Sequence, residues 1–244
     1  MLETYYVGVY WGARQETAAA CAHRASRFFQ SLAACAPSFQ QWYLPARGRS
    51  TPGTPGLPLR ANDLQALEAV MLEGRHFTDS GHHVIEELGF TLTAWNSRKH
   101  ASDMTLSCGS SSPHVGNACV MSFPSQGEVF ERLVSTPLLT QVLSCMVSAW
   151  EPEWGVATSR ILRELVSPPH SKALFPGWLT YFSRRRGTVP PLPVPARIAP
   201  MGNEGTLITL SDERLTASNP EHRNLLTRLH HLLDRTGLLL PLGP

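Results

Sequence analysis

Lysine is nearly missing from this chain of 244 residues: Lys99 and Lys172 are the only two, and arginine supplies the rest of the 21 basic residues. With 19 acidic residues, the formal net charge is only +2, too small for the long-range field that collects nucleic acid or anionic membrane. The sequence also has no acidic run that would imitate the phosphates of a nucleic acid. A nucleic-acid interaction would therefore need a local basic patch.

Long apolar runs are absent too. No segment reaches the roughly 18 consecutive apolar residues of a membrane-spanning helix. The first residues, MLETYYVGVYWG, contain a glutamate where a signal peptide needs a basic start and an apolar run. The five cysteines are odd in number, lack C-x-x-C spacing and lie in apolar stretches: Cys21, Cys35, Cys108, Cys119 and Cys145. We expect free thiols in a reducing compartment, a cytoplasmic location and no membrane partner.

The motifs that assign a reaction class are missing: the sequence has no G-x-S-x-G, P-loop, Rossmann or H-E-x-x-H pattern. The histidines between residues 76 and 114 fall in predicted loops without cysteine or carboxylate at ligand spacing, so we predict no metal site and no cofactor. One catalytic alternative stays open. In WEPEWG, Glu151 or Glu153 desolvated against indole would serve a hydrolase as an acid, together with a loop histidine. A turn with both glutamates in water is the simpler interpretation, so we predict no enzyme.

An apolar fraction of 42% with 16% charged residues is typical of a folded domain. Apolar residues recur at helical spacing after Ala18, after Asn62 or Asp63, after Thr136 and near the C-terminus. Alternating or β-branched runs predict strands, which lie at residues 4–12, 90–96, 103–109, 118–123, 156–162, 177–182 and 205–211. The pattern predicts an α+β fold with mostly antiparallel sheet flanked by several helices.

A segment rich in proline and glycine, residues 45–58, has no apolar period and no capping signal. We expect it to form a mobile loop. The chain length suits a single domain covering residues 1–244, or two packed halves that divide near residue 150.

The stretch GWLTYFSRRRG, residues 177–187, combines aromatic rings with three arginines. A strand over 177–182 is apolar on both faces, which favours burial. The arginines then form a solvated loop end, a protein-docking edge or a grip for nucleic acid, although no second basic cluster supports the last of these. Trp, Tyr and Arg dominate interface hot spots, so the predicted partner-binding residues are Trp178, Tyr181, Arg184, Arg185 and Arg186.

Five segments in fixed order resemble the immunity protein 52 family of bacterial polymorphic toxin systems: YYVGVYWGAR, ELGFTLTAWN, AWEPEWGVATS, PGWLTYFSR and LTASNPEHRNL. The similarity extends from about residue 4 to residue 240. The order of short motifs supports it, and the motif residues are Trp11, Gly12, Trp95, Asn96, Trp150, Trp154 and Gly177. Three of the tryptophans, Trp11, Trp95 and Trp150, end or interrupt apolar elements, and we expect them in the core.

The resemblance implies a small α+β protein made beside a toxin, which it binds and inactivates. It implies no enzymatic activity and no cofactor. It also implies that the cognate toxin carries a restriction-endonuclease-like nuclease domain and is exported by a specialised secretion apparatus. Because the chain has no acidic run to imitate DNA, we expect it to act by shape, through covering the active site or through an exosite.

Overall fold

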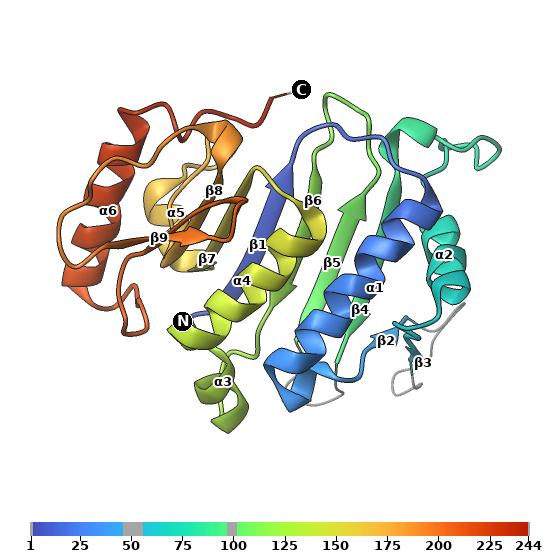
Figure 1. The fold of residues 1–244 in the computed structure, drawn as a ribbon, viewed down its shortest axis with the longest axis horizontal. Coiled ribbons are helices and arrows are strands. Elements are labelled where there is room, and N and C mark those ends of the chain that lie inside the picture. Colours follow the sequence, from blue (N-terminus) through green and yellow to red (C-terminus); the bar gives the residue numbers. More distant parts are fainter. Residues whose placement is uncertain (1, 46–55, 97–101, 244) are drawn as a thin grey trace.

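The computed structural model describes residues 2–45, 56–96 and 102–243, which form one ten-stranded antiparallel sheet with six α-helices (Figure 1). The α+β prediction is confirmed. The strand order is β3-β2-β4-β5-β6-β1-β7-β8-β10-β9. The strands are β1 (Tyr5–Trp11), β2 (Tyr43–Leu44), β3 (Leu57–Pro58), β4 (Phe90–Trp95), β5 (Asp103–Cys108), β6 (Asn117–Ser122), β7 (Trp154–Ser159), β8 (Leu179–Ser183), β9 (Arg197–Met201) and β10 (Gly205–Thr209). The helices are α1 (Ala18–Cys35), α2 (Leu64–Glu73), α3 (Glu128–Leu133), α4 (Thr136–Trp150), α5 (Arg160–Val166) and α6 (Pro220–Asp234).

The first strand, β1, lies in the middle of the sheet. It pairs with β6 on one side and β7 on the other, so strands from before and after residue 150 share one sheet. Six of its seven residues are buried, which explains its β-branched and aromatic composition. A single domain, with a possible division near residue 150, remains our prediction for the organisation of the chain.

Three helices, α1, α2 and α4, cover one face of the sheet (Figure 1). Thr17 caps α1 by accepting a hydrogen bond from the backbone N–H of Ala20 at 3.2 Å, and Asp63 caps α2 in the same way through Ala66 at 3.0 Å. Pro137 lies in the first turn of α4, where its missing N–H removes no helical hydrogen bond. Among the described residues, no helix combines the length and the hydropathy that crossing a bilayer requires.

The strands predicted at residues 90–96, 103–109 and 118–123 are present as β4, β5 and β6, which are sequential antiparallel neighbours. One predicted strand has the wrong end, and two short elements were not predicted. The strand predicted over residues 156–162 ends at Ser159, because the Ser159 hydroxyl accepts from the Leu162 N–H at 3.1 Å and starts α5. The short helix α3 and the edge strand β9 were not predicted, since both are brief and weakly patterned.

Most of the segment predicted as a mobile loop, residues 46–55, lies outside the described residues. Its end does not match that prediction, because Leu57–Pro58 forms the edge strand β3 and pairs with β2. The core prediction for tryptophan is confirmed for Trp11 and Trp150, which are buried. It is wrong for Trp95, which is only partly buried because β4 has a single short strand, β2, on that side.

Candidate functional site

The arginine run divides into two parts. It forms a short 3₁₀ turn, Arg184–Arg186, directly after β8. The Arg186 guanidinium donates hydrogen bonds to three backbone carbonyls of the C-terminal segment, of Leu238 and Pro241 at 3.2 Å and of Leu240. Arg184 and Arg185 are exposed, and neither side chain forms an ion pair with another described residue. Arg186 therefore anchors the C-terminal segment to the end of β8, while the side chains of Arg184 and Arg185 are available to a partner.

A pocket of about 300 Å³ lies beside these two arginines. Ser183 in its wall is only 7% exposed, and its Oγ has no hydrogen-bond partner. Burial, followed by the charge of Glu204, raises the pKa of Tyr181 to about 12, so this hydroxyl stays protonated and neutral. The lining comes from three separate segments: Glu151, Pro152, Glu153, Tyr181, Ser183, Arg184, Arg185, Asn203 and Glu204. The two exposed guanidinium groups at the rim suit a carboxylate of a partner protein, while three glutamates line the same pocket.

Glu153 is fixed by the ends of the strands around it. Its Oε1 accepts a hydrogen bond from the Gly12 N–H at 3.0 Å, and its Oε2 lies 3.9 Å from the Arg186 guanidinium. The Glu153 backbone N–H donates to the Tyr10 carbonyl at 3.0 Å. A side chain at Gly12 would collide with this carboxylate and with the Gly243 carbonyl, 3.1 and 2.9 Å from the added carbon. The Gly12–Glu153 contact therefore explains why glycine follows Trp11.

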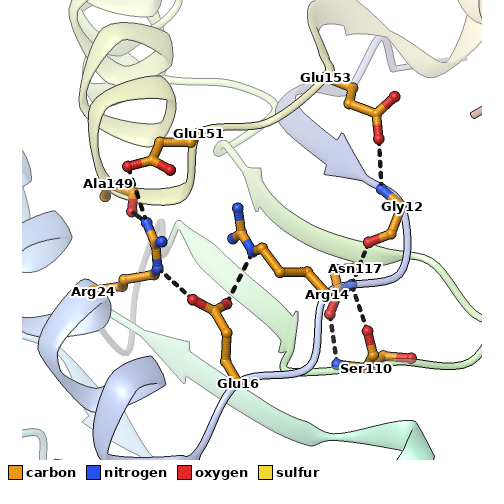
Figure 2. A network of polar contacts seen from close by, with 9 residues as sticks. All are labelled: Gly12, Arg14, Glu16, Arg24, Ser110, Asn117, Ala149, Glu151 and Glu153. Atoms are coloured by element: carbon orange, nitrogen blue, oxygen red, sulfur yellow. Dashed lines mark hydrogen bonds and ion pairs between the residues drawn. The ribbon is translucent and has the colours of Figure 1, made fainter.

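Glu151 ends α4 in a left-handed conformation, with φ 47°, which is uncommon for a residue with a side chain. Its carboxylate lies 3.5 Å from the Arg24 guanidinium, which also donates to the Ala149 carbonyl at 2.9 Å (Figure 2). Figure 2 shows Glu16 between Arg24 and Arg14, at 2.7 and 3.1 Å. Burial alone would lower the pKa of Arg24, but the hydrogen bond and charge of Glu16 outweigh it, so the pKa is raised.

Asn117, at the start of β6, holds the end of β1 and was not predicted from the sequence. Its amide nitrogen donates to the carbonyls of Gly12 at 2.7 Å and Ser110 at 3.1 Å, and its side-chain oxygen accepts from the Ser110 N–H at 2.8 Å (Figure 2). Asn117 is only 1% exposed, and these three hydrogen bonds satisfy the polar atoms of its buried amide. The one signal in the sequence was a polar residue at the start of an apolar strand.

Two of the predicted partner-binding residues are in the core. Trp178 is 0% and Tyr181 1% exposed, and the Trp178 indole donates to the Ser211 carbonyl at 2.8 Å. The strand that was predicted to be apolar on both faces is covered on both, so neither ring is available as a surface anchor in this structure. Gly177 precedes this strand where an added carbon would lie 2.5 Å from Val156. The docking hypothesis therefore rests on the exposed arginines.

The remaining motif residues have structural contacts. Trp154 is buried and stacks on Tyr10 with ring centroids 4.9 Å apart. Asn96 bridges two segments: its amide nitrogen donates to the Ser38 carbonyl at 2.9 Å, and its oxygen accepts from the Ser102 N–H at 2.8 Å. Both residues therefore support the fold.

The two alternative functions find little support in this geometry. Among the described residues that line the pocket there is no histidine, so the glutamate and histidine that the hydrolase hypothesis needs do not meet there. The described part of the chain also contains no group of three or more His, Cys, Asp or Glu placed to hold a metal ion. For nucleic acid, the two free arginines share their pocket with three glutamates, which does not produce an extended basic groove.

Comparisons with known proteins were made for sequence and for structure. A family model described as Immunity protein 52 matches residues 3–242. No curated protein matches the chain. Among solved structures, the chain is similar to the Pseudomonas aeruginosa T6SS protein PA0821, with a TM-score of 0.54 and 13% sequence identity over 95% of this chain and 76% of that chain. At this identity the likeness concerns the fold.

Proposed function

The chain belongs to the immunity protein 52 family, and from this premise we propose that it binds a cognate toxin encoded nearby and inactivates it. The toxin is a nuclease with a restriction-endonuclease-like domain, delivered by a specialised secretion system, as the resemblance implies. The chain acts in the cytoplasm as a binding inhibitor, without a cofactor and without a catalytic step of its own.

Arg184 and Arg185 are exposed and have no ion-pair partner within the described part of the chain, and this observation supports a docking surface at the β8 end of the sheet. A guanidinium offers two parallel N–H donors that match the two oxygens of a carboxylate. Nucleases that use metal ions hold them with carboxylates. In the proposed complex the arginines pair with such carboxylates.

Charge argues for blocking by shape and against imitation of DNA. The net charge is +2. Two of the pocket glutamates already have partners within the chain: Glu151 forms an ion pair with Arg24, and Glu153 accepts a hydrogen bond from the Gly12 N–H. The inhibitor therefore covers the active site or holds an exosite. A dissociation constant near 1 nM corresponds to about −12 kcal/mol, which a buried area of about 1,600 Å² with a few strong anchors supplies.

Co-expression with the toxin-like product of the neighbouring gene tests the binding role. We expect growth rescue together with a 1:1 complex in size-exclusion chromatography with light scattering. Expression of the toxin with an unrelated protein of similar size is the control. Growth arrest in both cultures, with no complex, would contradict the proposed function.

The nuclease assignment is tested separately with purified components. We expect the toxin alone to degrade plasmid DNA in the presence of Mg²⁺, and an equimolar amount of this chain to stop the reaction. A complex that forms while the toxin leaves DNA intact would overturn the nuclease assignment and keep the binding role.

A further inference from the structure

Two thiols meet where α1 packs against α4. Cys35 is the last residue of α1, and Cys145 lies in α4, 110 residues further along the chain. Their sulfur atoms are 3.5 Å apart. Both side chains are partly exposed and neither is disulfide-bonded. The fold has thus placed two accessible thiols in contact from distant parts of the sequence.

The other cysteines differ in access to solvent. Cys21, Cys108 and Cys119 are all 0% exposed. The neighbouring Cys21 thiol, followed by burial, raises the pKa of Cys108, and burial raises the pKa of Cys119, both far above the ordinary range of a thiol. Since the thiolate is the reactive form and the oxidant must reach it, the buried set is protected from oxidation.

We propose that Cys35 and Cys145 form a reversible intramolecular disulfide when the folded chain meets a disulfide oxidant such as glutathione disulfide. The inference does not depend on the proposed function. The two sulfurs must close from 3.5 Å to about 2.05 Å. Cys35 is followed by Ala36 in an extended conformation, so the approach occurs at a helix end, where the backbone adjusts more easily than inside a helix.

The exchange has two balanced steps. The Cys35 thiolate attacks one sulfur of glutathione disulfide, forms a mixed disulfide and releases one glutathione thiolate. The Cys145 thiol loses its proton to water, attacks the Cys35 sulfur and releases the second glutathione thiolate. The two protein thiols lose two electrons in total, and the oxidant accepts them and becomes two molecules of glutathione. The first attack is assigned to Cys35 because it is the last residue of α1, whereas Cys145 lies inside α4.

The cross-link would tie together the two long helices on the sheet. The Arg24 side chain on α1 already bonds to the Ala149 carbonyl at the end of α4, and the disulfide adds a covalent tie at the other end of α1. Closing a loop of 110 residues restricts the unfolded chain. We therefore expect the oxidised protein to unfold at a temperature higher by roughly 5 °C or more.

The test incubates the purified folded chain in a series of reduced and oxidised glutathione mixtures. Each sample is quenched with acid, alkylated, digested and measured by mass spectrometry. We expect one cross-linked peptide pair, containing Cys35 and Cys145, whose amount increases with the oxidised fraction and returns to zero with excess dithiothreitol. Cys21, Cys108 and Cys119 should remain reduced while the protein is folded.

Matched variants separate the cross-link from other effects of oxidation. Cys35→Ser and Cys145→Ser should each lose the cross-linked peptide and the rise in unfolding temperature, whereas Cys119→Ser should keep the cross-link. Full alkylation of Cys35 and Cys145 in the wild type after equilibration with millimolar glutathione disulfide would overturn the inference. So would a cross-link that joins any other pair of cysteines in the folded protein.

Discussion

The indole rings of Trp11 and Trp150 stack with centroids 5.6 Å apart and an interplanar angle of 12°, which joins the end of β1 to the end of α4. The Arg14 guanidinium lies over the Trp11 ring, 5.1 Å from its centre. The same helix end carries Glu151, which lines the candidate docking pocket. The stacked pair therefore sets the position of one wall of that pocket.

Replacing Trp150 by alanine should destabilise the fold strongly. Trp150 is 0% exposed and also contacts Phe28, and loss of a large buried side chain costs about 3–5 kcal/mol. Urea unfolding monitored by circular dichroism measures the change. Trp95→Ala is the control, because this ring is partly exposed and its loss should destabilise less. Equal effects of the two substitutions would contradict the assignment of Trp150 to the core.

Glu16→Gln should reduce stability by about 1–3 kcal/mol, because it removes the charge that pairs with both Arg14 and Arg24 at a site where the Glu16 side chain is only 11% exposed. Chemical denaturation gives the free energy of unfolding. The matched control is Glu131→Gln, which removes a carboxylate paired with Arg214 at 2.8 Å but 65% exposed, where water weakens the pair. A larger loss for Glu131→Gln than for Glu16→Gln would argue against the network.

Arg186→Ala should release the C-terminal segment, because the Arg186 guanidinium is hydrogen-bonded to the carbonyls of Leu238, Leu240 and Pro241. Hydrogen exchange of residues 238–243 should become faster, and the unfolding temperature should fall. Arg184→Ala, two residues earlier in the same 3₁₀ turn and exposed, should leave both quantities unchanged. If both variants behave alike, the division of the arginine run is wrong.

The double variant Arg184→Glu with Arg185→Glu should weaken binding to the cognate toxin at least tenfold, since two donors to partner carboxylates become repulsive charges. Isothermal titration calorimetry or biolayer interferometry measures the dissociation constant. Arg223→Glu with Arg228→Glu makes the same charge change on exposed positions of α6, outside the pocket, and should have little effect. An affinity unchanged within twofold for the first double variant would remove the arginines from the interface.

Local sequence signals predicted most of the secondary structure. The apolar spacing after Ala18 and the cap at Asp63 identified two helices, because both depend on neighbours within a few residues. The predicted burial of the strand at residues 177–182 is confirmed as well. Prediction failed where contacts between distant parts of the chain determine the end of an element or the burial of a side chain. The strand over 156–162 was drawn too long because the start of α5 depends on the Ser159 hydroxyl, and Trp95 was placed in the core although its side of the sheet is thinly covered.

The sequence by itself determined the fold class, the family resemblance and the composition of the arginine run, since these follow from residue type and order. Only the tertiary structure decided the roles within that run: the C-terminal carbonyls lie within reach of Arg186 and not of its two neighbours. It also brought Ser183 beside Glu151 and Glu204 in one pocket, and Cys35 beside Cys145 across 110 residues. Side chains so distant along the chain come into contact because the sheet and its helices pack together. A local sequence pattern does not predict that packing.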